Sequence, residues 1–212
     1  MTQPQPDLHR RIANALARIE AVSRSEHQRA AQVAALSPLQ VRVCVALQSR
    51  PGLRVGALAR ELLVTTGTVS AAVSVLEEKL LVTKQTDPEE HRAVVLVLTA
   101  KGRREVSKLS SWPDAVFEPI VSDLGEEAAA ALLESLLRLL QAVERRGWID
   151  PARMCFHCEY FSPWKGKGKR PHRCELLKVS IGGAELQVDC PDFEPVSPTV
   201  QETRWKELNR HA

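Results

Sequence analysis

Residues 55–79 decide the fold, and they read VGALARELLVTTGTVSAAVSVLEEK. The stretch predicts a short helix over residues 55–62 and a second helix over residues 65–79, with Thr65 as a preferred N-cap residue type. Only residues 63–64 separate the two helices. Two short helices joined by so brief a turn are typical of a helix-turn-helix motif.

Upstream of this stretch, two more helices are expected. A stripe of apolar residues at three- and four-residue steps predicts one long amphipathic helix over residues 7–36, and its members are Leu8, Ile12, Leu16, Ile19 and Val22. Ser37 and Pro38 then supply an N-cap and a first-turn proline for a helix that continues to Ser49.

Downstream of the motif, the hydrophobic period changes from the helical value to the alternation of a strand. Residues 80–84 and 93–98 predict short strands, and Asp87 and Pro88 give the segment between them the composition of a turn. The two strands therefore predict a β-hairpin. This hairpin is the wing of a winged helix-turn-helix fold.

Further helices complete the first part of the chain. Residues 99–102 cap a helix that runs toward Ser111 and must break or kink around Pro113. A strongly amphipathic helix is expected over residues 126–146. The predicted fold class is therefore mainly α with a small β-hairpin wing, an α+β arrangement, followed by a small irregular module.

The composition is that of an ordinary globular protein. The 212 residues allow one large domain, or one ordinary domain with a small appendage. Apolar residues make up 44% and charged residues 26%, which excludes wholesale disorder. No apolar run approaches the roughly 20 residues that cross a bilayer, and the N-terminal segment lacks the blocks of a signal peptide. We therefore expect a cytoplasmic protein without a membrane partner, and the net charge of +3 permits a nucleic-acid partner.

Aromatic residues and cysteines are concentrated near the C-terminus. No aromatic residue precedes Trp112, and five of the nine lie between residues 155 and 193. Four of the five cysteines lie in the same stretch, whereas Cys44 falls in an apolar helix and is expected to be a core residue. The chain is therefore expected to contain a second module over residues 150–196, followed by a helix or tail over residues 197–212.

A series of motifs occurs in order along the first module: LSPLQ (36–40), GALAR (56–60), TVS (68–70), LEEKLLV (76–82), DPEEHR (87–92) and LTAKGR (98–103). Together they resemble the MarR family of winged-helix transcriptional regulators over about residues 7–147. The resemblance implies a homodimer with a dimerisation region over residues 1–36 and 100–147 and a DNA-binding domain over residues 37–99. It also implies a regulator rather than an enzyme, with repression as the expected mode and a pseudo-palindromic double-stranded DNA operator as partner.

Two sets of side chains are candidate DNA contacts. Small polar side chains on the second helix of the motif suit base edges: Thr65, Thr66, Thr68, Ser70 and Ser74. Nearby basic side chains suit phosphates, and the last two members of this set lie at the expected wing tip: Arg54, Arg60, Lys79, Lys84, His91 and Arg92. The wing sequence Glu90-His91-Arg92 stands where the family usually has Asp-Arg-Arg or Asp-x-Arg. The alternative interpretation is that these hydroxyls only cap and solvate a helix, and that the charges only balance the surface.

The four C-terminal cysteines have the spacing Cys155-x2-Cys158-x15-Cys174-x15-Cys190. In a cytoplasmic protein this cluster indicates a metal site more than a pair of disulfides. Four thiolates are ligands of both zinc and iron-sulfur clusters. A zinc ribbon normally repeats the close cysteine pair, whereas here the second pair is split by fifteen residues.

The segments around these cysteines resemble the ligand pattern of high-potential iron-sulfur proteins, which hold a four-iron cluster with a close cysteine pair and two distant cysteines. The resemblance implies a [4Fe-4S] cluster as cofactor on the four cysteines, and Zn²⁺ is the alternative. Nearby aromatic side chains would shield a cluster, and nearby basic ones would offset thiolate charge: Phe156, Tyr160, Phe161, Trp164 and Phe193 in the first group, and Lys165, Lys167, Lys169, Arg170 and Arg173 in the second. The alternative interpretation is that the aromatic residues form the core of a small domain, and that the basic run is a solvated loop or a second phosphate contact. His157 and His172 could each replace a cysteine ligand.

The sequence thus favours a MarR-like regulator whose iron-sulfur cluster senses redox state, oxygen or iron. One alternative keeps the DNA binding but makes the metal a structural zinc, with a small apolar effector bound between the dimerisation helices and the DNA-binding lobe. Another alternative is an electron-transfer or catalytic module that uses the winged helix as a docking scaffold. The sequence contains no nucleophile-base pair or Gly-rich phosphate loop that would favour this last class.

Overall fold

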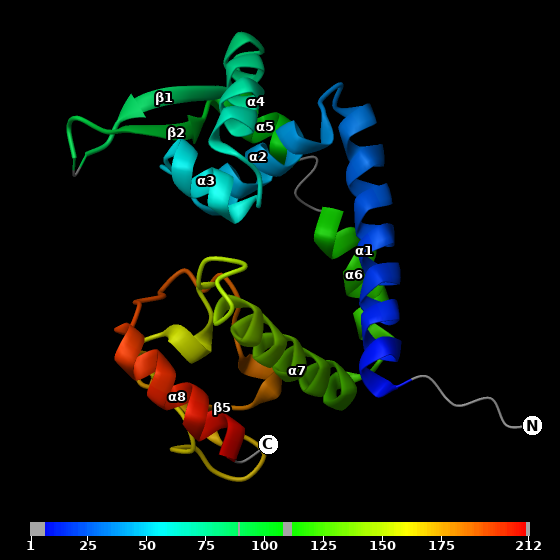
Figure 1. Cartoon of the computed structure of the whole chain (residues 1–212), viewed down its shortest axis with the longest axis vertical. Coiled ribbons are helices and arrows are strands. Elements are labelled where there is room, and N and C mark those ends of the chain that lie inside the picture. The colour runs from blue at the N-terminus through cyan, green and yellow to red at the C-terminus, as the bar shows by residue number, and fades with distance from the viewer. Residues whose placement is uncertain (1–6, 89, 108–111, 211–212) are drawn as a thin grey trace, which may run out of the picture. The chain divides into compact units, whose positions relative to one another are not determined.

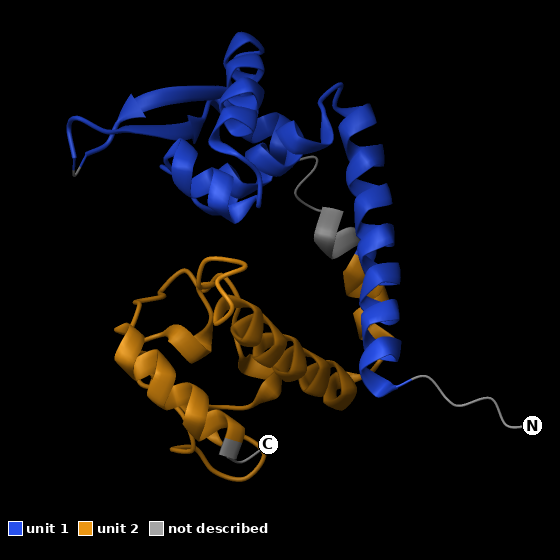
Figure 2. Ribbon diagram, in the orientation of Figure 1, with its two compact units in different colours: residues 1–116 blue, residues 117–212 orange. Residues whose placement is uncertain are grey.

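The protein has two compact units in its computed structural model, residues 1–116 and 117–212 (Figure 1 and Figure 2). The structure describes residues 7–88, 90–107 and 112–210. Glu89 of the expected wing turn and Ser111 at the expected helix end lie outside these described residues. Within them, no single helix is long and apolar enough to cross a membrane, although the helices Leu8–Val33 and Pro38–Ser49 pass that test as a pair bent by 93°.

The first unit is a helical bundle with one β-hairpin. Its elements, in chain order, are α1 (Leu8–Val33), α2 (Pro38–Ser49), α3 (Val55–Glu61), α4 (Thr66–Glu78), β1 (Val82–Thr86), β2 (Val94–Leu98), α5 (Ala100–Ser107) and the start of α6 (Trp112–Ser122). The strands β1 and β2 pair antiparallel, with Val82 opposite Leu98 and Thr86 opposite Val94. This is the element order of a winged helix-turn-helix, and it confirms the mainly helical fold with a small hairpin.

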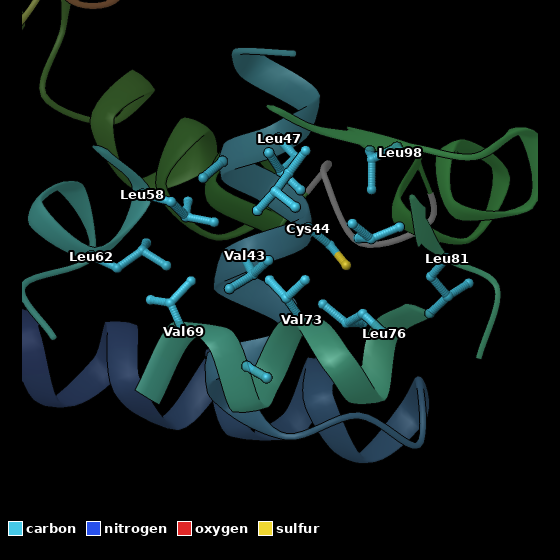
Figure 3. Packing of buried hydrophobic residues seen from close by; sticks show 14 of the residues in the cluster. Val43, Cys44, Leu47, Leu58, Leu62, Val69, Val73, Leu76, Leu81 and Leu98 are labelled. Atoms are coloured by element: carbon cyan, nitrogen blue, oxygen red, sulfur yellow. The ribbon is translucent and has the colours of Figure 1, made fainter. Parts of the chain in front are cut away.

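The helix-turn-helix is held around one apolar core. Side chains from α2, α3, α4 and the hairpin meet in it, and Val43, Leu47, Leu58 and Leu76 are almost fully buried (Figure 3). Cys44 is fully buried among them, as expected for a core residue. Each such leucine contributes roughly 1.5–3 kcal/mol by leaving water, so the core fixes the crossing of the two helices of the motif.

Polar contacts set the ends of these helices. The Ser37 hydroxyl accepts the Gln40 N–H, and the Gln40 side chain accepts the Ser37 N–H, so α2 begins with a complete capping box. Thr65 caps α4 by accepting the Thr68 N–H at 3.2 Å. In the turn between α3 and α4, the Arg42 guanidinium of α2 donates to the Leu62 carbonyl at 2.8 Å. The turn is therefore tied to the bundle as well as to its own helices.

The prediction that the first strand starts at residue 80 was wrong. Leu80 has a positive φ of 59°, and the Leu81 N–H donates to the Leu76 carbonyl, so both residues form the C-terminal turn of α4. The space beside them is also closed, because a Cβ added to Gly102 would lie 2.0 Å from the Leu81 carbonyl oxygen. The strand β1 therefore begins at Val82.

The second unit combines helices with a small sheet. Its elements after α6 are α7 (Glu126–Glu144), η1 (Cys155–His157), β3 (Phe161–Ser162), β4 (His172–Cys174), β5 (Val179–Ile181), η2 (Gly183–Glu185) and α8 (Pro198–Arg210). The three strands are antiparallel in the order β3-β4-β5. The module expected to be irregular therefore contains a three-stranded sheet, and α6 spans a segment where only a break near Pro113 was predicted.

One core joins the helices of this unit to its cysteine segment. Leu137 of α7 and Leu208 of α8 are fully buried together with Met154 and Phe156 of the cysteine segment. The helix α7 thus packs on the cysteine module, and α8 is an integral part of the unit.

Candidate functional site

Helix α4 exposes the polar face that the sequence analysis singled out. Its opposite face is buried in the core through Val69, Ala72, Val73 and Leu76. The five hydroxyl residues Thr65, Thr66, Thr68, Ser70 and Ser74 are all exposed. Because the apolar face is committed to the core, the hydroxyl face is the one that can meet a ligand.

These hydroxyls differ in whether they are already engaged. The Thr65 and Thr68 hydroxyls lie 2.8 Å apart, and the Ser74 hydroxyl donates to the Ser70 carbonyl at 3.0 Å. The side chains of Thr66 and Ser70 have no hydrogen-bond partner within the described part of the chain. Thr66 and Ser70 are therefore the residues of this face best prepared to donate to a base edge.

The base of the wing is tied to the N-terminus of α3. Arg54 donates to Asp87 at 2.7 Å and to Glu90 at 2.6 Å. This fork holds the start of the wing turn against the N-cap residue of α3. Arg54 is therefore a wing anchor in this structure rather than an unengaged phosphate contact.

The other predicted phosphate contacts fall into two groups. Lys84 pairs with Glu77 at 2.7 Å, and the Lys79 ammonium donates to the Ala35 carbonyl at 2.6 Å. His91 and Arg92 are exposed at the wing tip and have no partner among the residues that the structure describes. Exposed pairs such as Lys84 with Glu77 are weak, so a phosphate can compete for the lysine. Arg92 has no ion pair to give up before it can bind a phosphate, among the residues that the structure describes.

The elements α2 to α4 with the hairpin form a winged helix-turn-helix unit. Residues 36–93, which hold α2 to α4 and most of the hairpin, match the model of the MarR family. Comparison with curated protein sequences finds no match.

Solved structures agree with this fold. FabT from Streptococcus pneumoniae, solved in complex with DNA, is 26% identical with a TM-score of 0.57, and the match covers 65% of this chain and 99% of that chain. The transcriptional regulator BldR from Sulfolobus solfataricus is 26% identical with a TM-score of 0.52, over 68% of this chain and 99% of that chain. MepR from S. aureus, solved as a DNA complex, shares the fold at 22% identity and a TM-score of 0.53, over 62% of this chain and 97% of that chain.

The second candidate site is a pocket of about 440 Å³ in the second unit, and all four C-terminal cysteines line it. Tyr160 and Phe161 also line it, and Phe161 packs on Phe156 below with ring centroids 5.6 Å apart. Three sequence segments thus bring their cysteines to one pocket: residues 155–158, Cys174 and Cys190. Of the five aromatic residues expected to shield a cluster, Tyr160 and Phe161 line the pocket.

The pKa of Cys155 depends on its burial and on the three other cysteines. Burial raises the pKa of the Cys155 thiol to about 11, the Gln187 N–H opposes this shift by donating to Cys155 Sγ at 3.2 Å, and the three other cysteines raise the pKa further. No three His, Cys, Asp or Glu side chains within the described ranges are arranged to hold a single metal ion. A tetrahedral zinc site would bring its sulfur atoms to within about 4 Å of one another.

Two arginines beside this pocket escaped the sequence analysis. Arg153 donates to the carbonyls of Cys190 at 3.0 Å and Pro191 at 3.2 Å. Arg204 of α8 donates to the carbonyls of Cys158 and Glu159. Each guanidinium therefore holds the backbone of a cysteine segment and brings a positive charge beside it. Arg204 lies 46 residues from Cys158, and no local spacing points to this contact.

The two histidines of the module point to other partners. His157 Nε2 donates to the Glu144 carboxylate at 2.5 Å, and both side chains are nearly fully buried. His172 packs against Phe161 and Trp164, with ring centroids 5.1 and 4.8 Å apart, and burial lowers its pKa. Neither histidine is among the described residues that line the cysteine pocket. Neither histidine therefore takes the place of a cysteine at this pocket. His157 is hydrogen-bonded to Glu144, and His172 packs against aromatic rings.

Glu144 is a joint between α7 and the cysteine segment. Its second carboxylate oxygen accepts the Ala152 N–H at 2.7 Å while the first holds His157. The substitution Glu144→Ala leaves both buried donors unpaired, so it should lower the free energy of unfolding of the second unit by roughly 1–3 kcal/mol. Urea unfolding followed by tryptophan fluorescence measures this loss.

Glu202→Ala provides the matched control, because Glu202 of α8 pairs with Arg145, the residue after Glu144, and both side chains are exposed. It should leave the unfolding midpoint nearly unchanged. Equal losses of unfolding free energy in the two variants would show that the buried contacts of Glu144 contribute no more than the exposed pair of Glu202.

Proposed function

We propose that this protein is a DNA-binding transcriptional regulator of the MarR type, acting as a repressor. The observation that carries the proposal is the exposed hydroxyl face of α4 beside a wing with an unengaged Arg92, within the segment that matches the MarR family. The hydroxyls would read base edges in the major groove, and Arg92 would contact phosphate or enter the minor groove. The FabT and MepR structures, both solved with DNA, support this choice of partner.

The regulator is proposed to act as a homodimer. The apolar stripe of α1 stays exposed in the single chain, with Leu8, Ile12, Ile19 and Val22 each about half exposed. Such a stripe is costly in water and needs a partner surface. A second copy would cover it and would place two recognition helices on one duplex, with half-sites about 10 base pairs apart, one helical turn.

The cysteine pocket is proposed to hold a [4Fe-4S] cluster on Cys155, Cys158, Cys174 and Cys190. All four cysteines line one cavity of about 440 Å³, so their thiols open onto a common space that a cofactor could share. The Gln187 N–H on Cys155 Sγ and the arginines on the adjacent carbonyls are the kinds of contact that tune a cluster. When bound, the cluster supplies a redox-active centre that responds to oxidant or to iron supply.

The joint at Glu144 would carry the signal to the rest of the chain. His157 lies between Cys155 and Cys158, so any rearrangement of this cysteine pair acts on its buried bond to Glu144 of α7. Ordering of a small metal module is largely folding free energy, and loss of the ligand should loosen the segment that grips α7. The stability of α7 would then differ between the unit with its cofactor and the unit without it. This difference would change the population of the dimer form that binds DNA.

The DNA interface predicts different outcomes for neighbouring substitutions. Arg92→Ala should weaken binding to all duplexes alike, because a wing cation contacts the backbone. Ser70→Ala should reduce discrimination between operator and single-base variants by about 1–3 kcal/mol at one position. Ser74→Ala is the matched control, since its hydroxyl is donated to the Ser70 carbonyl. Titrations of labelled duplexes by fluorescence anisotropy separate these effects, and unchanged affinity in Arg92→Ala would contradict this docking.

The cofactor is tested on protein purified without oxygen. A broad visible absorption with about four iron and four sulfide per chain is the expected result for a [4Fe-4S] cluster. Cys174→Ser should abolish that absorption while leaving the helical circular dichroism signal, whereas Cys44→Ser should keep the absorption because Cys44 lies in the other core. A colourless wild-type protein with one zinc per chain would replace the cluster by a structural metal.

A further inference from the structure

A basic loop projects from the second unit, and neither proposed site uses it. It comprises residues 163–171, which read PWKGKGKRP, and we call it the basic loop. It contains four cations and no acid. Lys165, Lys167, Lys169 and Arg170 are all exposed.

The basic loop has a built conformation. The Gly166 N–H donates to the Pro171 carbonyl at 2.8 Å, and the Arg170 N–H donates to the Lys167 carbonyl at 3.1 Å, which closes the tip. Gly168 in this tip has a φ of 55°, a region that suits glycine. A Cβ at Gly166 would lie 1.9 Å from the Arg170 carbonyl oxygen, so no other residue fits there. The basic loop therefore holds its cations in a closed, hydrogen-bonded turn.

The loop is also fixed to the sheet of the second unit. A Cβ at Gly182, directly after β5, would lie 2.5 Å from the Lys169 carbonyl oxygen, so the backbones of the two segments are in close contact. Arg170 pairs with Glu185 of η2 at 2.6 Å. These contacts anchor the base of the loop and leave its lysines outside.

Three lysines of the loop are uncompensated. Lys165, Lys167 and Lys169 have no acidic partner in the part of the chain that the structure describes, whereas Arg170 and Arg173 pair with Glu185 and Glu175. Of the basic loop, only Arg170 is among the described residues that line the cysteine pocket. Whether the lysines offset the charge of the four thiolates stays a prediction.

We propose that the basic loop is a second DNA-contacting surface, which binds the phosphate backbone of duplex DNA. Ammonium groups are point charges without the fork of arginine, and they suit phosphate oxygens better than base edges. The three lysines occupy alternate positions along a closed turn. A nucleic-acid backbone carries phosphates at regular intervals, so several of these lysines could each meet a phosphate. The inference rests on the proposed DNA binding, and it predicts a contribution to affinity that is independent of sequence.

The test compares two doubly substituted chains with equal loss of charge. Lys167→Gln with Lys169→Gln removes two loop cations, and Lys178→Gln with Lys206→Gln removes two exposed lysines outside the loop. Each lost phosphate contact should flatten the slope of log affinity against log salt by about 0.9. For each chain of the proposed homodimer, the loop variant should therefore lose about 2 in slope, and it should bind operator and scrambled duplex several-fold more weakly by the same factor. The control should keep the wild-type slope.

Two further measurements make the result decisive. Lys167→Arg with Lys169→Arg should restore the slope, because the charge is restored, and the visible absorption and circular dichroism of the glutamine variant should match the wild type. Equal slopes for the loop variant and the control would overturn the loop contact while leaving the winged-helix proposal in place. If the wild-type chain binds no duplex at any salt concentration, both proposals fall together.

Discussion

Helix α4 can bury only one of its faces, and this constraint organises the first unit. Val69, Val73 and Leu76 must leave water, so they turn the helix until its hydroxyl residues face outward. The Arg42 contact to the Leu62 carbonyl fixes the turn before α4, and Arg54 fixes the wing beside it. The exposed surface is therefore a consequence of the core, and its side chains are oriented before any ligand arrives. Such preorganisation lowers the entropy cost of binding.

The second unit faces a different constraint, because a small core must hold long loops. Its apolar centre is built from a few side chains, of which Phe156 and Phe161 are the largest. The remaining order comes from polar clamps that reach across the sequence: Glu144 on His157, Arg153 on Cys190 and Arg204 on Cys158. A group that joined the four cysteines would add a cross-link to these clamps and would stabilise the unit further.

Local chemistry explains which parts of the structure could be predicted. The helix starts at Pro38 and Thr66 follow from caps that are visible in the sequence, and the wing follows from alternation around Asp87 and Pro88. The start of β1 was missed because Leu80 and Leu81 have the composition of a strand but serve as the end of α4. Packing of Leu81 against Gly102 ends the helix here, and Gly102 lies too far along the chain to belong to the local sequence pattern.

The candidate sites divide in the same way. The hydroxyl face and the four cysteines were readable because their spacing is local or repeated, whereas the engagement of Arg54 by the wing acids and of His157 by Glu144 depends on contacts between distant segments. The roles of Arg153 and Arg204 were invisible for the same reason. Whether the proposed DNA contacts and ligands act as assigned stays a prediction.

In the regulator proposed above, the cysteine unit controls the DNA affinity of the winged helix. The most direct test measures the dissociation constant of one operator duplex with the same wild-type preparation, first loaded with iron and sulfide without oxygen and then stripped by a chelator. The account predicts constants that differ by at least about fivefold, with an unchanged circular dichroism signal from the helical bundle. Equal constants for the loaded and stripped protein at every salt concentration would contradict it.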